Sequence, residues 1–216
     1  MKNLLYMALF TFILSGCKQK ETQKEPESMP TVAEKIAKAN GLDTWSHVKE
    51  IDFTFAGARH WQWYPKTNDI TYTQDTVTVS YNRAVVDSTT MPIDRAFIND
   101  KFWLLVPFQL VWDKSATISD PKKTTAPISK KEINEITITY PNDGGGYTPG
   151  DAYDIYYDDD YMIREWAYRK GNQPEPSLLN TFENYQEFNG IKIALEHKKA
   201  EGDWNLKFSD VKVILD

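Results

Sequence analysis

The sequence predicts a mainly β (α+β) fold in which one helix precedes an antiparallel, meandering sheet of about ten strands, of barrel or half-barrel shape. Three observations lead to this prediction. Apolar and polar residues alternate along most of the chain after position 50, which is typical of strands with one buried face. Turn-forming pairs such as Asn189-Gly190 separate the alternating runs. Aromatic residues, which are enriched in strands, make up 13% of the chain.

The amino terminus resembles the signal peptide of a bacterial lipoprotein. A basic start at Lys2 precedes the apolar run Leu4–Leu14, which is too short to cross a bilayer core of about 30 Å as a helix but suits a signal-peptide core. Leu14-Ser15-Gly16-Cys17 resembles a lipobox, in which the cysteine thiol receives a diacylglycerol and cleavage leaves that cysteine first. We therefore predict a signal peptide at residues 1–16 and lipidation of Cys17. An ordinary secretory signal with an incidental cysteine is the alternative.

Residues 17–30 are predicted to be the lipidated cysteine and a flexible tether. The segment after Cys17 is polar and charged, has no apolar periodicity, and contains Pro26 and Pro30. Lys18 stands where an Asp often signals retention at the inner membrane in proteobacterial lipoproteins. The sequence thus predicts a lipid-anchored protein of the cell envelope, favouring the outer membrane, at its periplasmic face or on the surface.

A single domain is predicted over residues 31–216, because a segment of this length can bury a hydrophobic core large enough to stabilise one domain. It opens with a helix over Thr31–Asn40, where Thr31 and Glu34 have the spacing of a capping box and Gly41 suits the carboxyl-terminal cap. Strands follow from Ile51 onward. The segment Phe102–Trp112 is an exception, because apolar residues occupy both its odd- and its even-numbered positions. It is interpreted as a doubly buried strand or as a short helix beginning near Pro107.

Composition argues against several function classes. The chain has 31 acidic and 25 basic residues, a net charge of −6, which does not suit a nucleic-acid partner. One cysteine excludes an internal disulfide and a cysteine-based zinc site. The histidines His47, His60 and His197 lie far apart without metal-binding spacing. The run Asp158–Asp160 lacks the EF-hand pattern and is interpreted as a solvated hairpin turn.

The sequence contains no recognisable catalytic motif. Gly-x-Ser-x-Gly is absent, and the glycine-rich segment at 142–146 lacks the ending of a phosphate-binding loop. Carboxylates such as Asp52 and Glu165 could serve acid–base chemistry, but nothing in the sequence sets their separation. We therefore expect a protein that is not an enzyme and that needs no metal or cofactor.

Two segments resemble the outer-membrane lipoprotein-sorting (LolA/LolB-like) family. The first is the helix Ala33–Gly41 with Trp45 and Val48, leading into the strand Ile51–Phe55. The second is Gly150–Asp158, which turns into Ile163–Trp166. This resemblance implies an incomplete β-barrel wrapped over the N-terminal helix, which closes an apolar cavity as a lid. It also implies binding of the acyl chains of lipoproteins or of another lipid. Residues 88–93 and 144–150 are the candidates for a protruding loop that would deliver such cargo.

Strand parity places a set of large apolar side chains on the inner face, where they are predicted to form the cavity wall. Arg59 or His60 could then meet a polar headgroup, although the neighbouring tryptophans could equally be core. A packed core of the same residues, without ligand, is a further alternative. The predicted wall residues are Phe53, Phe55, Trp61, Trp63, Tyr72, Phe102, Trp103, Phe108, Trp112, Tyr153, Ile155 and Trp166.

The protein is predicted to be a membrane-anchored periplasmic lipoprotein that binds a hydrophobic ligand, a lipid or an acyl chain, in a half-barrel cavity. Lipid or lipoprotein trafficking is the process in which such binding is expected. Aromatic rings can also stack on sugars, so a lipoprotein that binds carbohydrate or an envelope polymer through an exposed aromatic face is the runner-up. A third hypothesis is a structural partner that pairs through a sheet edge.

Overall fold

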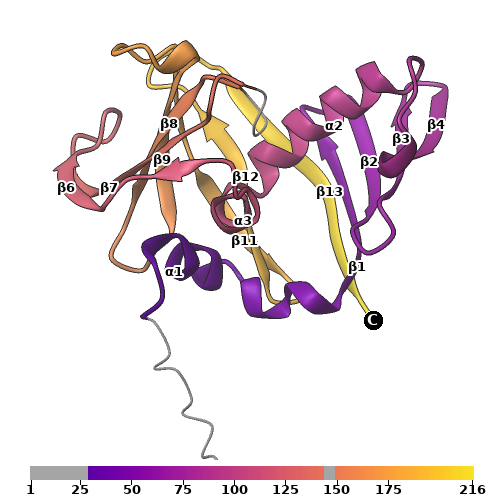
Figure 1. Cartoon of the computed structure of the whole chain (residues 1–216), viewed down its shortest axis with the longest axis horizontal. Coiled ribbons are helices and arrows are strands. Elements are labelled where there is room, and N and C mark those ends of the chain that lie inside the picture. The colour runs from indigo at the N-terminus through magenta and orange to yellow at the C-terminus, as the bar shows by residue number, and fades with distance from the viewer. Residues whose placement is uncertain (1–28, 144–148) are drawn as a thin grey trace, which may run out of the picture.

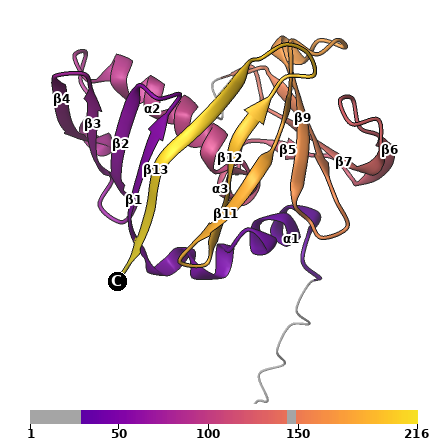
Figure 2. The ribbon, with the colours of Figure 1, turned by 180° about the vertical axis from the view of Figure 1, so that it is seen from behind.

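The computed structural model describes residues 29–143 and 149–216. These residues form two antiparallel sheets that curve around two internal helices, with a third helix at one open end (Figures 1 and 2). The predicted signal peptide, Cys17 and most of the predicted tether lie outside the described residues, as does most of the candidate loop at 144–150. None of the helices described is long and apolar enough to cross a membrane.

The larger sheet has seven strands in the order β11-β12-β13-β1-β2-β3-β4. Its β11–β12 turn is the predicted Asn189-Gly190 hairpin, with φ of 48° and 84° at the two residues. Both positive values fit the tight turn that this dipeptide favours. The strands are β1 (Val48–Phe55), β2 (Arg59–Tyr64), β3 (Asp69–Gln74), β4 (Val77–Asn82), β11 (Glu183–Phe188), β12 (Ile191–Lys198) and β13 (Asn205–Leu215).

The smaller sheet has the order β10-β9-β8-β7-β5, with β6 also paired to β7. The two sheets adjoin where β10 meets β12, and there the Lys198 amide donates a hydrogen bond to Thr181 Oγ1 at 3.0 Å. The sheets remain open elsewhere, so the predicted α+β half-barrel is confirmed. The strands are β5 (Thr117–Ile118), β6 (Lys122–Thr125), β7 (Glu132–Thr139), β8 (Ala152–Tyr157), β9 (Ile163–Arg169) and β10 (Leu178–Thr181).

The predicted N-terminal helix is confirmed as α1 (Val32–Ala39). Its capping box is complete, because the Glu34 amide donates to Thr31 Oγ1 at 3.2 Å and the Thr31 amide donates to Glu34 Oε2 at 2.7 Å. Ile36 and Ala37 are fully buried. Short 3₁₀ helices lie at Leu42–His47, Arg83–Val85 and Lys170–Asn172.

The expectation of one helix is incomplete, because two more cross the interior as α2 (Met91–Leu104) and α3 (Val106–Trp112) (Figure 1). Pro107 lies in the first turn of α3, which confirms the short-helix interpretation of this segment and excludes the strand. The prediction of a cargo loop at residues 88–93 is wrong for residues 91–93, because helix α2 begins at Met91.

Helix α2 divides the interior into two hydrophobic clusters. Phe97 and Leu104 pack with the larger sheet, whereas Phe102 packs with the smaller one, and Trp103 contacts both clusters. Buried carboxylates of the same helix bind arginines of the larger sheet and its flank: Asp100 pairs with Arg59 on β2 and Asp94 pairs with Arg83. These pairs fix the position of α2 and therefore of the space beside it.

Candidate ligand-binding site

A cavity of about 490 Å³ lies between α2 and the smaller sheet, within the range of small-molecule sites. We call it the aromatic cavity, because five of its lining side chains are aromatic. Its lining residues are Arg95, Ile98, Asn99, Phe102, Trp103, Tyr153, Trp166, Tyr168 and Leu178.

One stripe of α2 forms the helical wall of the aromatic cavity. Arg95, Ile98, Asn99 and Phe102 have the spacing i, i+3, i+4 and i+7, which places them on one face of a helix. Phe102 is buried at the inner end of the stripe, whereas Arg95 and Asn99 are exposed. The wall therefore changes from apolar inside to polar at the solvent side.

The opposite wall is a row of side chains across three neighbouring strands. Tyr168 on β9 pairs in register with Tyr153 on β8 and with Leu178 on β10. Trp166 lies two residues before Tyr168, and hence on the same face of the sheet. Sheet register thus brings together residues that lie far apart along the chain.

Ring contacts hold the walls of the aromatic cavity in place. The centroid of Trp166 lies 4.4 Å from that of Trp103 and 5.8 Å from that of Phe102, and Tyr153 lies 5.1 Å from Tyr168. Such pairs add about 0.5–1.5 kcal/mol each beyond area burial. The apolar wall is therefore formed before any ligand enters.

The Tyr168 hydroxyl group is committed within the protein. It donates a hydrogen bond to Asp151 Oδ2 at 2.7 Å, while the Gly171 amide donates to Asp151 Oδ1 at 2.6 Å. Burial of the phenol, together with the nearby Asp151 carboxylate, raises the pKa of Tyr168 above its usual range. Tyr168 thus stays protonated at neutral pH and presents its ring to the cavity.

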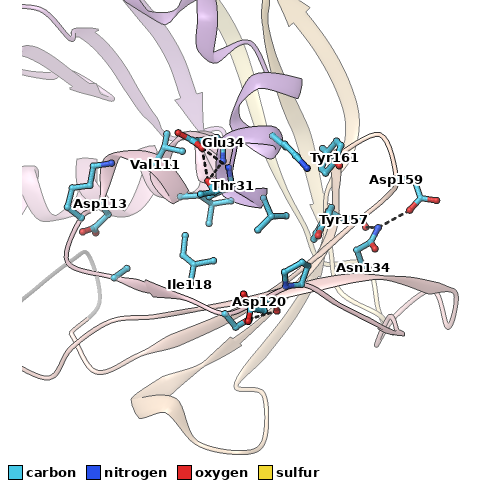
Figure 3. A pocket seen from close by; sticks show the side chains of 18 residues that line it. Thr31, Glu34, Val111, Asp113, Ile118, Asp120, Asn134, Tyr157, Asp159 and Tyr161 are labelled. Atoms are coloured by element: carbon cyan, nitrogen blue, oxygen red, sulfur yellow. Dashed lines mark hydrogen bonds between the residues drawn. The ribbon is translucent and has the colours of Figure 1, made fainter. Parts of the chain in front are cut away.

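A larger cavity of about 920 Å³ lies between α1 and the strands β5 and β7 (Figure 3). We call it the α1 cavity. Val111, Ile118 and Tyr157 form apolar parts of its wall, with Asp113 and Asp159 toward opposite ends. Its other charged lining residues are Glu34, Lys35, Lys114 and Asp120.

Several of these charged groups serve the local structure around the α1 cavity. Glu34 completes the capping box of α1. Asp113 Oδ1 accepts hydrogen bonds from the amide and hydroxyl of Ser115 at 3.1 and 2.6 Å. Asp159 Oδ1 accepts from Asn134 at 2.9 Å and from Lys123 at 3.0 Å. The mixed lining suits an apolar ligand less well than the aromatic cavity does.

Four of the twelve predicted wall residues line the aromatic cavity, namely Phe102, Trp103, Tyr153 and Trp166. Ile155 is buried in the same cluster beside them. The other seven pack in the core between the larger sheet, α2 and α3, and none of the twelve lines the α1 cavity. Those seven are Phe53, Phe55, Trp61, Trp63, Tyr72, Phe108 and Trp112.

Strand parity therefore identified the inner face for the residues that lie on strands, but α2 and α3 cover most of that face. For Phe102, Trp103, Phe108 and Trp112 the assumption of strand parity was wrong, because these residues lie on the two helices. Five lining residues were not predicted: Arg95, Ile98, Asn99, Tyr168 and Leu178. The helical spacing of the first three was the available signal, and Tyr168 continues the alternation of Trp166.

The hypothesis that Arg59 or His60 meets a headgroup does not fit the structure. Arg59 donates two hydrogen bonds of 2.7 Å to Asp100, and His60 Nδ1 lies 3.0 Å from Thr54 Oγ1. Neither side chain lines either cavity. Trp61 and Trp63 are buried in the core, as the alternative interpretation held.

The described residues contain no group of three His, Cys, Asp or Glu side chains that could hold a metal ion. The three histidines lie on separate elements. The Asp158–Asp160 turn is confirmed as a solvated turn, since its three carboxylate side chains are 47%, 88% and 56% exposed, and two of them pair with Arg164. The carboxylates of Asp52 and Glu165 lie on different sheets, and Glu165 accepts the amides of Ile128 and Ser129 at 2.7 and 2.8 Å.

Buried His197 is expected to make the fold sensitive to acid. It packs against Phe182, Trp103 and Phe208, and burial lowers its pKa from 6.5 to about 4. The unfolded chain therefore binds an extra proton between about pH 6.5 and 4, so stability is lost as the pH falls across that interval. This group should account for about 3 kcal/mol.

Urea unfolding of the His197→Gln variant between pH 7 and 4 measures this effect. We expect the variant to lose less stability than the unmodified protein over that interval. His47→Gln, which changes an exposed histidine, is the matched control and should retain the full decline. Equal slopes for all three proteins would contradict the prediction.

Comparisons with known proteins provide no assignment of function. No protein-family model matches the chain, and no curated protein matches it. A solved structure of a DUF1329 family protein from Desulfovibrio piger is similar over 84% of this chain and 91% of that chain. The two share 8% sequence identity with a TM-score of 0.40.

Proposed function

We propose that this protein is a lipid-anchored envelope protein, related to the LolA/LolB-like group, that binds a lipid or acyl chain in the aromatic cavity and carries out no catalysis. The observation that carries the proposal is a preformed cavity of about 490 Å³ that is lined by five aromatic side chains. Ile98 and Leu178 add aliphatic surface, and Arg95 is the one charged side chain among the described lining residues.

The physical basis is the burial of an alkyl chain. Each methylene group removed from water contributes about 0.8 kcal/mol. Because the ring contacts already hold the walls in place, little side-chain freedom is lost when a ligand enters. An aromatic lining can therefore retain a chain of several methylenes without specific polar groups.

The amino-terminal sequence supports the location. A basic start, a short apolar core and the lipobox-like Leu14–Cys17 precede a polar segment that leads to α1. An anchored domain with an apolar cavity would meet its ligand at a membrane surface. Lipid or lipoprotein trafficking is the process that joins these two features.

Binding of a carbohydrate or envelope polymer is the second candidate. It is favoured by Trp204, which is 39% exposed and lies 6.5 Å from the ring of Trp103 beside the aromatic cavity. Among the described aromatic side chains, Trp204 is the one that is exposed. Because a stacking platform needs several exposed rings, the largely buried rings of the aromatic cavity favour the lipid.

The proposal predicts that filling the aromatic cavity abolishes binding of a neutral apolar probe. We expect N-phenyl-1-naphthylamine to bind the full chain with increased fluorescence. Leu178→Trp should lower its affinity about tenfold or more, because the added ring occupies space next to Tyr168. Fluorescence titration measures both affinities, and circular dichroism verifies the fold.

Leu179→Trp is the matched control, because Leu179 is the next residue of β10 and packs against a different cluster that includes Ala167. Successive strand residues face opposite sides of a sheet, so this variant should bind the probe normally. Mass spectrometry of lipids that copurify with the full chain then identifies the ligand class. An unmodified protein that binds neither probe nor lipid would overturn the proposal.

A further inference from the structure

The chain has five arginines, and four of them are bound to carboxylates. The fifth, Arg95, makes no ion pair or hydrogen bond with any residue in the described part of the chain. It is also the arginine that lines the aromatic cavity. The four engaged pairs are Arg59 with Asp100, Arg83 with Asp94, Arg164 with Asp158 and Asp160, and Arg169 with Asp154.

The carboxylates closest in sequence to Arg95 are occupied by other partners. Asp94 accepts hydrogen bonds from Arg83 Nε at 2.7 Å and from the Tyr81 hydroxyl at 3.1 Å. Asp100 accepts from Arg59, from Trp61 Nε1 at 2.9 Å and from Asn99 Nδ2 at 3.0 Å. These two acids are therefore already neutralised by groups on other elements.

The carboxylate on the sheet side of the aromatic cavity is occupied as well. Asp151 accepts the Tyr168 hydroxyl through one oxygen and the Gly171 amide through the other. The guanidinium group of Arg95 thus keeps its donors available at the solvent side of an apolar cavity. A guanidinium fork binds carboxylate and phosphate groups through two parallel hydrogen bonds.

We propose that the ligand of the aromatic cavity is an amphiphile with an anionic head, whose carboxylate or phosphate group is bound by Arg95 while its alkyl chain lies among the rings. This inference rests on the proposed function and adds the chemical class of the ligand. The polarity of α2 matches such a molecule, because its exposed Arg95 and buried Phe102 are two helical turns apart. A neutral or cationic amphiphile would leave Arg95 without a counter-ion.

Displacement of N-phenyl-1-naphthylamine from the full chain by three ligands of equal chain length tests the inference. These are dodecanoate and dodecyl phosphate, each below its critical micelle concentration, and dodecanol below its solubility limit. We expect the two anions to bind about tenfold more tightly than the alcohol, because a charge-assisted hydrogen bond is worth more than a neutral one. That preference should shrink as the salt concentration rises.

Variants of Arg95 separate the contribution of the ligand's anionic head to the affinity from the contribution of its alkyl chain. Arg95→Gln should bind the two anions about tenfold more weakly, while its affinities for dodecanol and the probe should change much less. Arg95→Lys should keep part of the preference, because it retains the charge but loses the fork. Lys38→Gln, which removes an exposed cation from α1, is the control and should keep the full preference.

The outcomes distinguish the inference from the proposed function. Equal affinity for the anions and the alcohol, or an anion preference that survives in Arg95→Gln, overturns the role of Arg95 and leaves apolar binding intact. Failure of the unmodified protein to bind the probe and all three ligands overturns both. Tighter binding of dodecanoate than of dodecyl phosphate supports a fatty-acid ligand, and the reverse order supports a phosphorylated lipid head.

Discussion

Asp100→Ala is expected to lower the free energy of unfolding by about 3 kcal/mol or more, because it removes one partner of a buried ion pair. The Asp100 side chain is fully buried. It accepts two hydrogen bonds from Arg59 and one from the indole nitrogen of Trp61. Without the carboxylate, a half-buried guanidinium group and a buried N–H group lose their acceptor. Urea denaturation measures the change.

The matched control is Asp159→Ala, which removes a carboxylate that is 88% exposed and pairs with Lys123. An exposed pair of this kind contributes about 0–1 kcal/mol, so this variant should unfold almost as the unmodified protein does. Because Asp100 also connects α2 to β2, Asp100→Ala should additionally weaken binding of the apolar probe. Similar stability losses in the two variants would contradict the prediction.

Lys101→Met is expected to stabilise the protein near neutral pH and to remove a pH dependence on the alkaline side. Lys101 is buried on α2, with its Nζ 5.5 Å from the ring of Trp63 and 5.7 Å from that of Trp112. Burial of the ammonium group, together with the nearby Arg83 charge, lowers the pKa of Lys101 from 10.5 to about 7.

The direction of this pH dependence of stability follows from proton linkage. Between about pH 7 and 10.5 the unfolded chain binds one proton more than the folded protein, so stability rises with pH over that interval. The rise should be on the order of 4 kcal/mol. Chemical denaturation at pH 7, 8, 9 and 10 measures it, and Lys101→Met should show a nearly flat profile. Lys49→Met, which removes an exposed lysine of β1, should keep the slope of the unmodified protein. A flat profile for the unmodified protein would contradict the prediction.

Local patterns predicted those elements of the fold whose stabilising contacts lie close together in sequence. The capping box of Thr31 and Glu34 defined the start of α1, and Asn189-Gly190 defined the β11–β12 hairpin. Two-residue alternation identified the sheets, because a buried face imposes that period directly. In each case the residues that stabilise an element also belong to it.

Helix α2 was not predicted from the sequence, and the reason is physical. Its buried faces carry Asp94, Asp100 and Lys101 among the apolar residues, so its hydrophobic stripe is interrupted. These charges are tolerated because arginines from β2 and from the segment after β4 bind the two carboxylates, and because aromatic rings surround the lysine. Such compensation comes from other elements and leaves no periodic signal in the helix itself.

The sequence by itself determined the antiparallel β architecture, the first helix and which face of each strand points inward, because these depend on neighbours along the chain. The tertiary structure alone decided where the interior is packed and where it is open. Helices α2 and α3 fill the space beside Phe53 and Trp61. The stripe of α2 from Arg95 to Phe102 instead lines the aromatic cavity together with Tyr153 and Tyr168. The same placement leaves Arg95 at that cavity without a carboxylate partner in the described chain, because ion pairs with Asp94 and Asp100 hold the helix in one orientation.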